Sequence, residues 1–300
     1  ILNLAKNKGI EDAVYKEMFV LSDNLTHYAK DFKTAFAHPD ITEENKKRLR
    51  EINSEMAVAT LKYGQNILAE TNSYELVISN KNDLAGLPNE LIETAASDAK
   101  AKGKAGKWMF TLSNSSVMPF LQYSSNRKLR KEIWNAYQMR ANHNNDKDNK
   151  ELAIKIANLR GEKARLLGYA THADYVLEKS MAKNPETATK LLNDLWVPAL
   201  NMANKEAADI KVMMQKDGIK DEVQPYDWRY YSEKIRKERF DLDEQEMKPY
   251  FSLEKTREGV FTVCGKLYGL QFKPLNNVPK YHEDVTVWEV TEADGKHIGI

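Results

Sequence analysis

The segment that decides the fold, residues 226–272, reads YDWRYYSEKIRKERFDLDEQEMKPYFSLEKTREGVFTVCGKLYGLQF. Asp227 is placed to cap an aromatic helix, and Asp243 is placed to begin a short one. Apolar residues then recur at helical spacing as far as Gly269, and only at Gln271 does the pattern become that of a β-strand. The segment therefore predicts a mainly helical protein whose helices lead into a small sheet.

Residues 281–300, YHEDVTVWEVTEADGKHIGI, have the pattern of a β-hairpin. Residues 285–290 are rich in branched and aromatic side chains, Asp294-Gly295 is a turn signal, and residues 296–300 begin a second strand. The chain ends inside that strand, and its first residues, ILNLAKNKGIEDAV, include no initiator methionine. We therefore expect the chain to be part of a longer protein. The alternative is that methionine removal and disordered tails explain both ends.

Upstream of these segments, residues that suit helix N-termini precede apolar residues at helical spacing. These signals are Asp40–Glu43, Asn126, Thr171–Asp174 and Asn184-Pro185. The helix that opens at Pro185 is predicted to extend as far as Lys216, with Pro198 either kinking it or dividing it in two.

Two short stretches, 75–79 and 107–112, are strand candidates. If they pair, the helix between them, which opens near Pro88, would be a crossover connection. The predicted fold class is therefore mainly α and multi-helical. It has a helical region over residues 1–270 and the start of a small β-sheet over residues 271–300.

The composition is that of a folded globular protein. Hydrophobic residues make up 42% of the 300 residues and charged residues 30%, a balance that disordered chains do not have. The net charge is +1, which gives no indication of a nucleic-acid or membrane-surface binder. Cys264 is the single cysteine, so no internal disulfide can form. No apolar run approaches the roughly 20 residues that span a bilayer.

No pattern in the chain predicts a metal site. A helical zinc site needs two ligands on one face, and two histidines four residues apart are its usual signal. The six histidines, His27, His38, His143, His172, His282 and His297, include no such pair. We therefore expect hydrogen-bonded or solvent-facing histidines. A zinc site assembled from distant residues is the disfavoured alternative.

Other candidate chemistries also have simpler explanations. Cys264 lies on an apolar stripe with Val260 and Leu267, which favours a buried, inert thiol over a catalytic one. Residues 103–107, GKAGK, lack the spacing of a phosphate loop and are expected to form a solvated turn. Almost all acidic residues suit caps or ion pairs with lysine and arginine, so no isolated pair of carboxylates is predicted.

A cluster of cations raises a nucleic-acid alternative. Basic and aromatic residues share one predicted helix; they are Lys234, Arg236, Lys237, Arg239, Trp228, Tyr230 and Tyr231. Such a mixture can bind a phosphate backbone. Glu233 and Glu238 dilute the charge, however, so we predict core packing with a solvated face, and an RNA-binding helical protein is the disfavoured alternative.

Five stretches of the sequence together resemble one protein family. They are DLAGLP (83–88), NRKLRKEIWNAYQMR (126–140), LRGEKARLLGY (159–169), the segment 226–272 and the terminal hairpin. In this order and spacing they resemble the zinc oligopeptidase family of thimet oligopeptidase and oligopeptidase A. The resemblance is strongest to its peptidyl-dipeptidase branch, also called dipeptidyl carboxypeptidase, and covers roughly residues 40–300.

The resemblance implies a mainly helical, two-lobed, channel-type fold and a zinc peptidase activity. In that family an HExxH motif and a glutamate on a later helix bind one zinc ion, and the glutamate inside the motif acts as general base on the metal-bound water. The peptidyl-dipeptidase branch releases C-terminal dipeptides, in contrast to an endopeptidase branch. Residues 1–270 would form channel wall, and residues 271–300 would lead into the catalytic region.

This sequence contains no HExxH, which the order of the family's motifs places after Ile300. We therefore assign no catalytic residue and no metal ligand to this chain, leave the substrate-binding residues unassigned, and expect the 300-residue chain alone to be inactive. The alternative function is a non-catalytic helical peptide-binding or scaffold module. The same resemblance places the hairpin of residues 285–300 near the cleft, where an edge strand could pair with an extended peptide.

The remaining expectations concern partners and compartment. The resemblance implies short unfolded peptides as substrates and a monomer, with no nucleic-acid or membrane partner. The single cysteine fits a reducing compartment, so we expect the cytoplasm, with the periplasm as the alternative.

Overall fold

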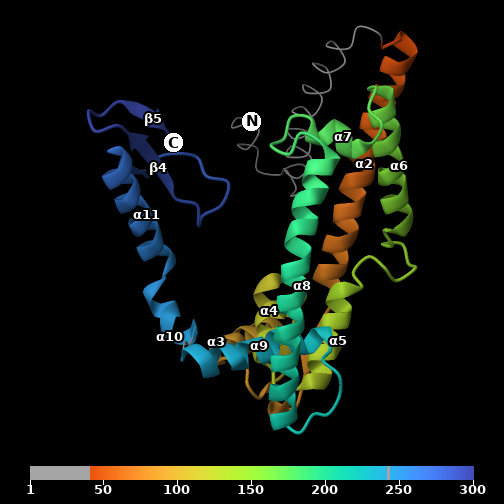
Figure 1. Cartoon of the computed structure of the whole chain (residues 1–300). Helices are drawn as coiled ribbons and strands as arrows, with labels where there is room; N and C mark the ends of the chain where they lie inside the picture. The colour runs from red at the N-terminus through yellow and green to blue at the C-terminus, as the bar shows by residue number, and fades with distance from the viewer. Residues whose placement is uncertain (1–40, 242–243) are drawn as a thin grey trace. The chain divides into compact units, whose positions relative to one another are not determined.

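The computed structural model describes residues 41–241 and 244–300. These residues fall into two compact units, one within residues 41–239 and one within residues 240–300, and each is described by itself. Helices dominate the described residues, and a small antiparallel sheet lies near the C-terminal end (Figure 1). The predicted mainly α fold class is therefore confirmed.

The first unit consists of helices and one two-stranded sheet. Its elements are α2 (Glu43–Ser73), β1 (Leu76–Ile78), a 3-10 turn (Lys81–Leu84), α3 (Asn89–Ala101), β2 (Trp108–Phe110), α4 (Asn114–Tyr123), α5 (Arg127–Gln138), α6 (Lys150–Leu166), α7 (His172–Leu177), α8 (Pro185–Lys216) and α9 (Pro225–Phe240). Helices α2 and α6 lie side by side (Figure 1). Within the described ranges, no helix is both long enough and apolar enough to cross a bilayer.

Side-chain caps fix where these helices begin. Thr42 Oγ1 accepts a hydrogen bond from the Asn45 backbone N–H, so Thr42 caps α2. The predicted capping box at 40–43 is therefore displaced, and Asp40 lies outside the described residues. The other predicted caps are confirmed: they are Asn126 for α5, the reciprocal box of Thr171 and Asp174 for α7, and Asn184 for α8.

The structure decides between two predicted forms of helix α8 and moves the predicted start of helix α9. Helix α8 continues without interruption past Pro198, so this proline does not divide it. Helix α9 begins at Pro225, and the predicted cap Asp227 lies inside its first turn. There its carboxylate accepts a hydrogen bond from the Gln224 backbone N–H, which is a role of the third helical position rather than of the cap. Asp243 lies outside the described residues.

The two predicted strands pair, and they do so antiparallel, with Val77 opposite Met109. The predicted crossover is therefore wrong, because α3 connects antiparallel neighbours. The main core lies between this sheet and helices α3, α4 and α5. The rings of Phe110 and Phe120 meet there edge to face, 4.7 Å apart, and Ile133 of α5 is completely buried.

The second unit carries the C-terminal sheet. Its elements are α10 (Glu244–Met247), a 3-10 turn (Lys248–Tyr250), α11 (Leu253–Tyr268), β3 (Gln271–Leu275), β4 (Val287–Thr291) and β5 (His297–Gly299). The strands are antiparallel in the order β3-β4-β5. Gly295 adopts a φ of +87° in the turn between β4 and β5, which confirms the predicted hairpin.

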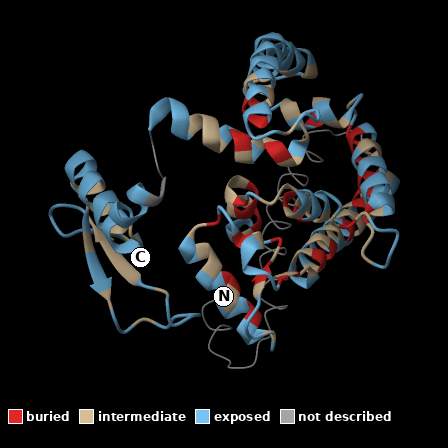
Figure 2. Ribbon diagram, turned by 90° about the horizontal axis from the view of Figure 1, so that it is seen from below, coloured by how far each residue is buried: buried red, intermediate tan, exposed pale blue. Residues whose placement is uncertain are grey.

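No described residue of the second unit is fully buried; its ribbon, next to the end marked C, is pale blue and tan in Figure 2. Val260 and Leu267 are more than half exposed, and Cys264 is only partly buried. The predicted burial of this stripe is therefore wrong. The physical reason is that α11 contacts the sheet through another side chain, Phe261, which stacks on Phe272 with ring centroids 4.2 Å apart.

Candidate functional site

Residues 41–241 and 244–300 include no group of three or more side chains that could hold a metal ion. Three described histidines lie within ion-pair distance of a carboxylate; the pairs are His143–Glu70, His282–Asp284 and His297–Glu289. Burial lowers the pKa of His172, whose Nδ1 has no hydrogen-bond partner. His27 and His38 lie outside the described residues.

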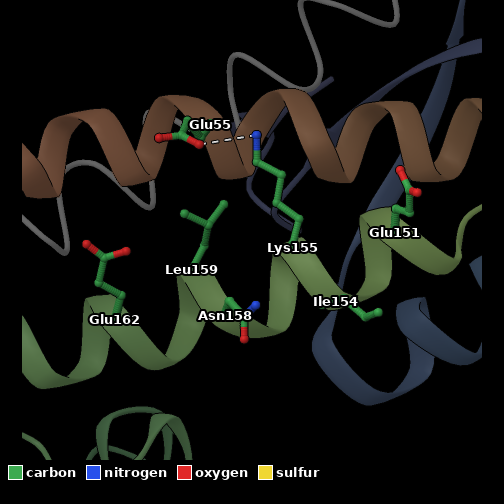
Figure 3. Close-up of a pocket in the computed structure, with 7 residues that line it drawn as sticks. All are labelled: Glu55, Glu151, Ile154, Lys155, Asn158, Leu159 and Glu162. Carbon is green, nitrogen blue, oxygen red and sulfur yellow. Dashed lines mark ion pairs between the residues drawn. The ribbon is translucent and has the colours of Figure 1, made fainter.

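A shallow groove lies between α2 and α6 (Figure 3). Its volume is about 380 Å³, and it is lined by Glu55 of α2 and by Glu151, Ile154, Lys155, Asn158, Leu159 and Glu162 of α6. Lys155 reaches across it, with its Nζ 3.2 Å from Oε2 of Glu55. Only two of the seven lining side chains, Ile154 and Leu159, are apolar, so few apolar side chains are available to hold a ligand.

Two of the three acids of this groove, Glu55 and Glu162, form ion pairs with cations. Arg48 donates two hydrogen bonds to Glu162, at 2.7 and 2.9 Å. These bonds lower the pKa of Glu162, and the bond from Lys155 is the main cause that lowers the pKa of Glu55. A general base near neutral pH needs a raised carboxyl pKa. The pairs therefore link α2 to α6 and supply no catalytic base.

A second polar cluster ties the loop after α5 to α2. The buried carboxylate of Glu70 accepts hydrogen bonds from the Ala141 backbone N–H at 2.6 Å and from Asn145 Nδ2 at 3.0 Å. His143 Nδ1 lies 3.0 Å from the same carboxylate. Burial raises the pKa of Glu70, but these three hydrogen bonds outweigh it, so the pKa lies below its ordinary value of 4.5. The cluster holds the loop in place.

We expect Glu70→Gln to lower the free energy of unfolding at pH 7 by about 1–2 kcal/mol, because hydrogen bonds to a charged acceptor are lost. A carboxyl whose pKa is lowered on folding stabilises the fold above its unfolded pKa and stops doing so as pH falls through the folded pKa. The difference between wild type and variant should therefore narrow as pH falls below about 4.5. Thermal unfolding from pH 7 to pH 3 measures this. Glu93→Gln, at an exposed site of α3, is the control, and equal pH profiles for all three proteins would contradict the assignment.

A third polar cluster joins α5 to α9. The completely buried Asp227 accepts two hydrogen bonds from Arg127, each 2.9 Å long, and one of 3.1 Å from Arg130. Arg130 also donates to the carbonyl of Ser124 at 2.7 Å and lies over the Tyr230 ring at 4.1 Å. The prediction that almost all acidic residues lie at caps or in ion pairs with lysine and arginine did not identify this cluster, because its partners lie about 100 positions apart in the chain.

The basic aromatic helix packs as predicted. Tyr231 is buried against Ile210, Met213 and Met214 of α8, with Trp228 and Tyr230 beside it. The cations Lys234, Arg236 and Arg239 pair with Asp217, Glu233 and Asp209. The helix therefore serves the core of the first unit, and its charge is compensated locally.

The C-terminal sheet has two edge strands that no further described strand covers. β4 is the central strand, so β3 and β5 are the two edges of the sheet in the described residues. The ring of Trp288 on β4 lies 4.8 Å from that of Phe261, and the Arg257 guanidinium lies 5.1 Å from the Trp288 ring. These contacts fix the sheet to α11. An edge strand held in this way can accept an extended peptide as a further strand.

Comparison with known proteins identifies the family. The model of Peptidase family M3 matches residues 120–300, which include α5 to α9 and the whole C-terminal sheet. The chain belongs to peptidase family M3. The resemblance inferred from the five sequence stretches is therefore confirmed.

Similar proteins include a dipeptidyl carboxypeptidase and two oligopeptidase A proteins. The chain is 34% identical to the dipeptidyl carboxypeptidase of Escherichia coli (strain K12), over 85% of this chain and 38% of that protein. It is 31% identical to the chloroplastic/mitochondrial organellar oligopeptidase A of Arabidopsis thaliana, over 86% of this chain and 34% of that protein. It is 28% identical to the oligopeptidase A of Escherichia coli (strain K12), over 98% of this chain and 41% of that protein. The chain thus spans well under half the length of these relatives.

Proposed function

We propose that the complete protein is a zinc peptidase that hydrolyses short peptides and releases dipeptides from their C-termini. The observation that carries this proposal is the M3 family match over residues 120–300, together with the 34% identity to a dipeptidyl carboxypeptidase. Organellar and bacterial oligopeptidase A proteins are also similar. The release of dipeptides is therefore a more specific proposal than the hydrolysis of peptides.

The catalytic zinc is proposed to lie on chain beyond Ile300. The described residues do not fit a zinc site, because they include no cluster of three ligating side chains. The polar clusters that are present use their carboxylates to hold helices and loops. No step of peptide hydrolysis is therefore assigned to a side chain of this chain.

The role proposed for this chain is to form channel wall and to present the C-terminal sheet. An extended peptide backbone would add to an edge of that sheet. The β4–β5 hairpin supports this role, because β5 is an edge strand and Ile298 on it is about half exposed. We propose in addition a monomer that acts in the cytoplasm, as the resemblance and the lone cysteine suggest.

Hydrolysis of a blocked-N-terminus peptide of about eight residues tests this function. We expect the complete gene product to release C-terminal dipeptides, to lose activity with a chelator and to regain it with zinc, while the 300-residue chain releases nothing. Mass spectrometry of the products separates the outcomes. Internal fragments without dipeptides would place the protein with the endopeptidases. No hydrolysis by the complete product would favour a binding or scaffold module.

A further inference from the structure

The N-terminal half of α8 carries a broad apolar surface that no other residue of its own unit, residues 41–239, covers. Seven large apolar side chains lie within residues 191–202 and are between 43 and 66% exposed; they are Leu191, Leu192, Leu195, Trp196, Val197, Leu200 and Met202. At 3.6 residues per turn, all of these except Val197, together with Ala199, cover about 200° of the helix circumference. A surface helix usually needs an apolar stripe of little more than about 100°.

This surface continues a core that already exists. Ile210, Met213 and Met214 lie on the same side of α8, and they are buried against Tyr231 of α9. The apolar side of α8 is therefore buried in a core near the C-terminal end of the helix and exposed near its N-terminal end. The remaining side of the helix is mostly polar, with Asp194 and Asn201, and Val197 is its one large apolar side chain between residues 191 and 202.

We infer that this surface, residues 191–202 of α8, is a docking face for the part of the complete protein that lies outside residues 1–300. The inference rests on the proposed function in one respect, which is that the complete protein resembles its relatives in length. About three fifths of the dipeptidyl carboxypeptidase has no counterpart in this chain. A width of about 200° is more than a single neighbouring helix covers, so we infer that at least two segments pack there.

Oxidative footprinting by hydroxyl radicals measures directly how accessible the side chains of this surface are to solvent. In the 300-residue chain, Trp196 and Met202 should be oxidised at rates similar to that of the fully exposed Met181, whereas the buried Met214 should be protected. In the complete gene product, oxidation of Trp196 and Met202 should be at least about fivefold slower than in the 300-residue chain. Equal rates in the two proteins would overturn the inference.

A pair of variants gives a second readout. Leu195→Asp should lower the melting temperature of the complete product by about 5 °C or more, because a charge would be buried, and should leave that of the 300-residue chain unchanged. Val212→Asp is the matched control, since Val212 is an exposed apolar residue on the polar side of the same helix. Its effect should be small in both proteins, and equal effects of the two variants in the complete product would contradict the docking face.

The same footprinting experiment distinguishes two other possible occupants of this surface, a second copy of the chain and a substrate peptide. Protection of Trp196 in the 300-residue chain that increases with its concentration would assign the face to a second copy, and protection by added peptide would assign it to substrate; either result would overturn the inference. Peptidase activity is measured on the same complete product. Activity without protection refutes the docking face alone, and protection without activity refutes the proposed function alone.

Discussion

Asp227→Asn should lower the free energy of unfolding by about 3–5 kcal/mol, the usual cost of removing one partner from a buried ion pair. Arg130 is almost completely buried, and its guanidinium would remain there without its anion. Arg127 would lose the acceptor of two hydrogen bonds. Because these bonds join α5 to α9, the variant should loosen the contact between the two helices. Urea unfolding followed by circular dichroism measures the change.

Asp221→Asn is the matched control for this variant. Asp221 also pairs with Arg127, but its side chain is 68% exposed. Its replacement should change the free energy of unfolding by less than about 0.5 kcal/mol. Similar losses for the two variants would show that burial of the carboxylate is not what gives the cluster its importance.

Gly86→Ala should lower the free energy of unfolding by about 3 kcal/mol, because two penalties combine. Gly86 has a φ of +86°, where a side chain is strained, and an added Cβ would lie 2.4 Å from the carbonyl oxygen of Tyr123. The turn cannot move away easily, since the Ser125 backbone N–H donates to the Ala85 carbonyl at 2.9 Å and Asn126 donates to Asp83. Thermal and urea unfolding measure the loss.

Gly103→Ala separates the two penalties. Gly103 has a φ of +71°, and an added Cβ would meet nothing within 4 Å. We expect a loss of about 1 kcal/mol from the backbone conformation alone. If Gly86→Ala costs no more than Gly103→Ala, the close approach of the DLAGLP turn to the end of α4 is not tight in solution.

Local signals in the sequence predicted most of the elements of this fold. The caps Asn126, Thr171 and Asn184 each begin a helix, and the Asp294-Gly295 turn closes the hairpin. These features depend on residues a few positions apart, which a sequence displays directly. The predicted cap Asp227 lies three residues after the cap position of α9, because a carboxylate can serve either at the cap or at the third helical position.

Contacts between distant segments could not be predicted in the same way. Asn66 and Glu70 of α2 look like surface residues, yet both are buried, and Asn66 donates to Asn149 at 2.9 Å. The reverse holds on α11, where Val260 and Leu267 form an apolar stripe that no other described residue of 240–300 covers. Periodicity shows which face of a helix is apolar, but the surface that covers it belongs to another part of the chain.

The same limit applies to the site. The absence of two histidines at helical spacing predicts that this chain carries no zinc ligands, and that expectation stays a prediction. The sequence does not predict that Glu55, Glu70 and Glu162 form contacts between separate elements. Their arginine, lysine, histidine and backbone partners lie on other helices or loops or at distant positions in the chain.

The most direct test of the central claim is the sequence of the gene downstream of the codon for Ile300. The account predicts an open reading frame that continues with HExxH and a glutamate on the following helix, within a total length near that of the dipeptidyl carboxypeptidase and oligopeptidase A relatives. A stop codon close to Ile300, or a continuation without two histidines four residues apart, would contradict it.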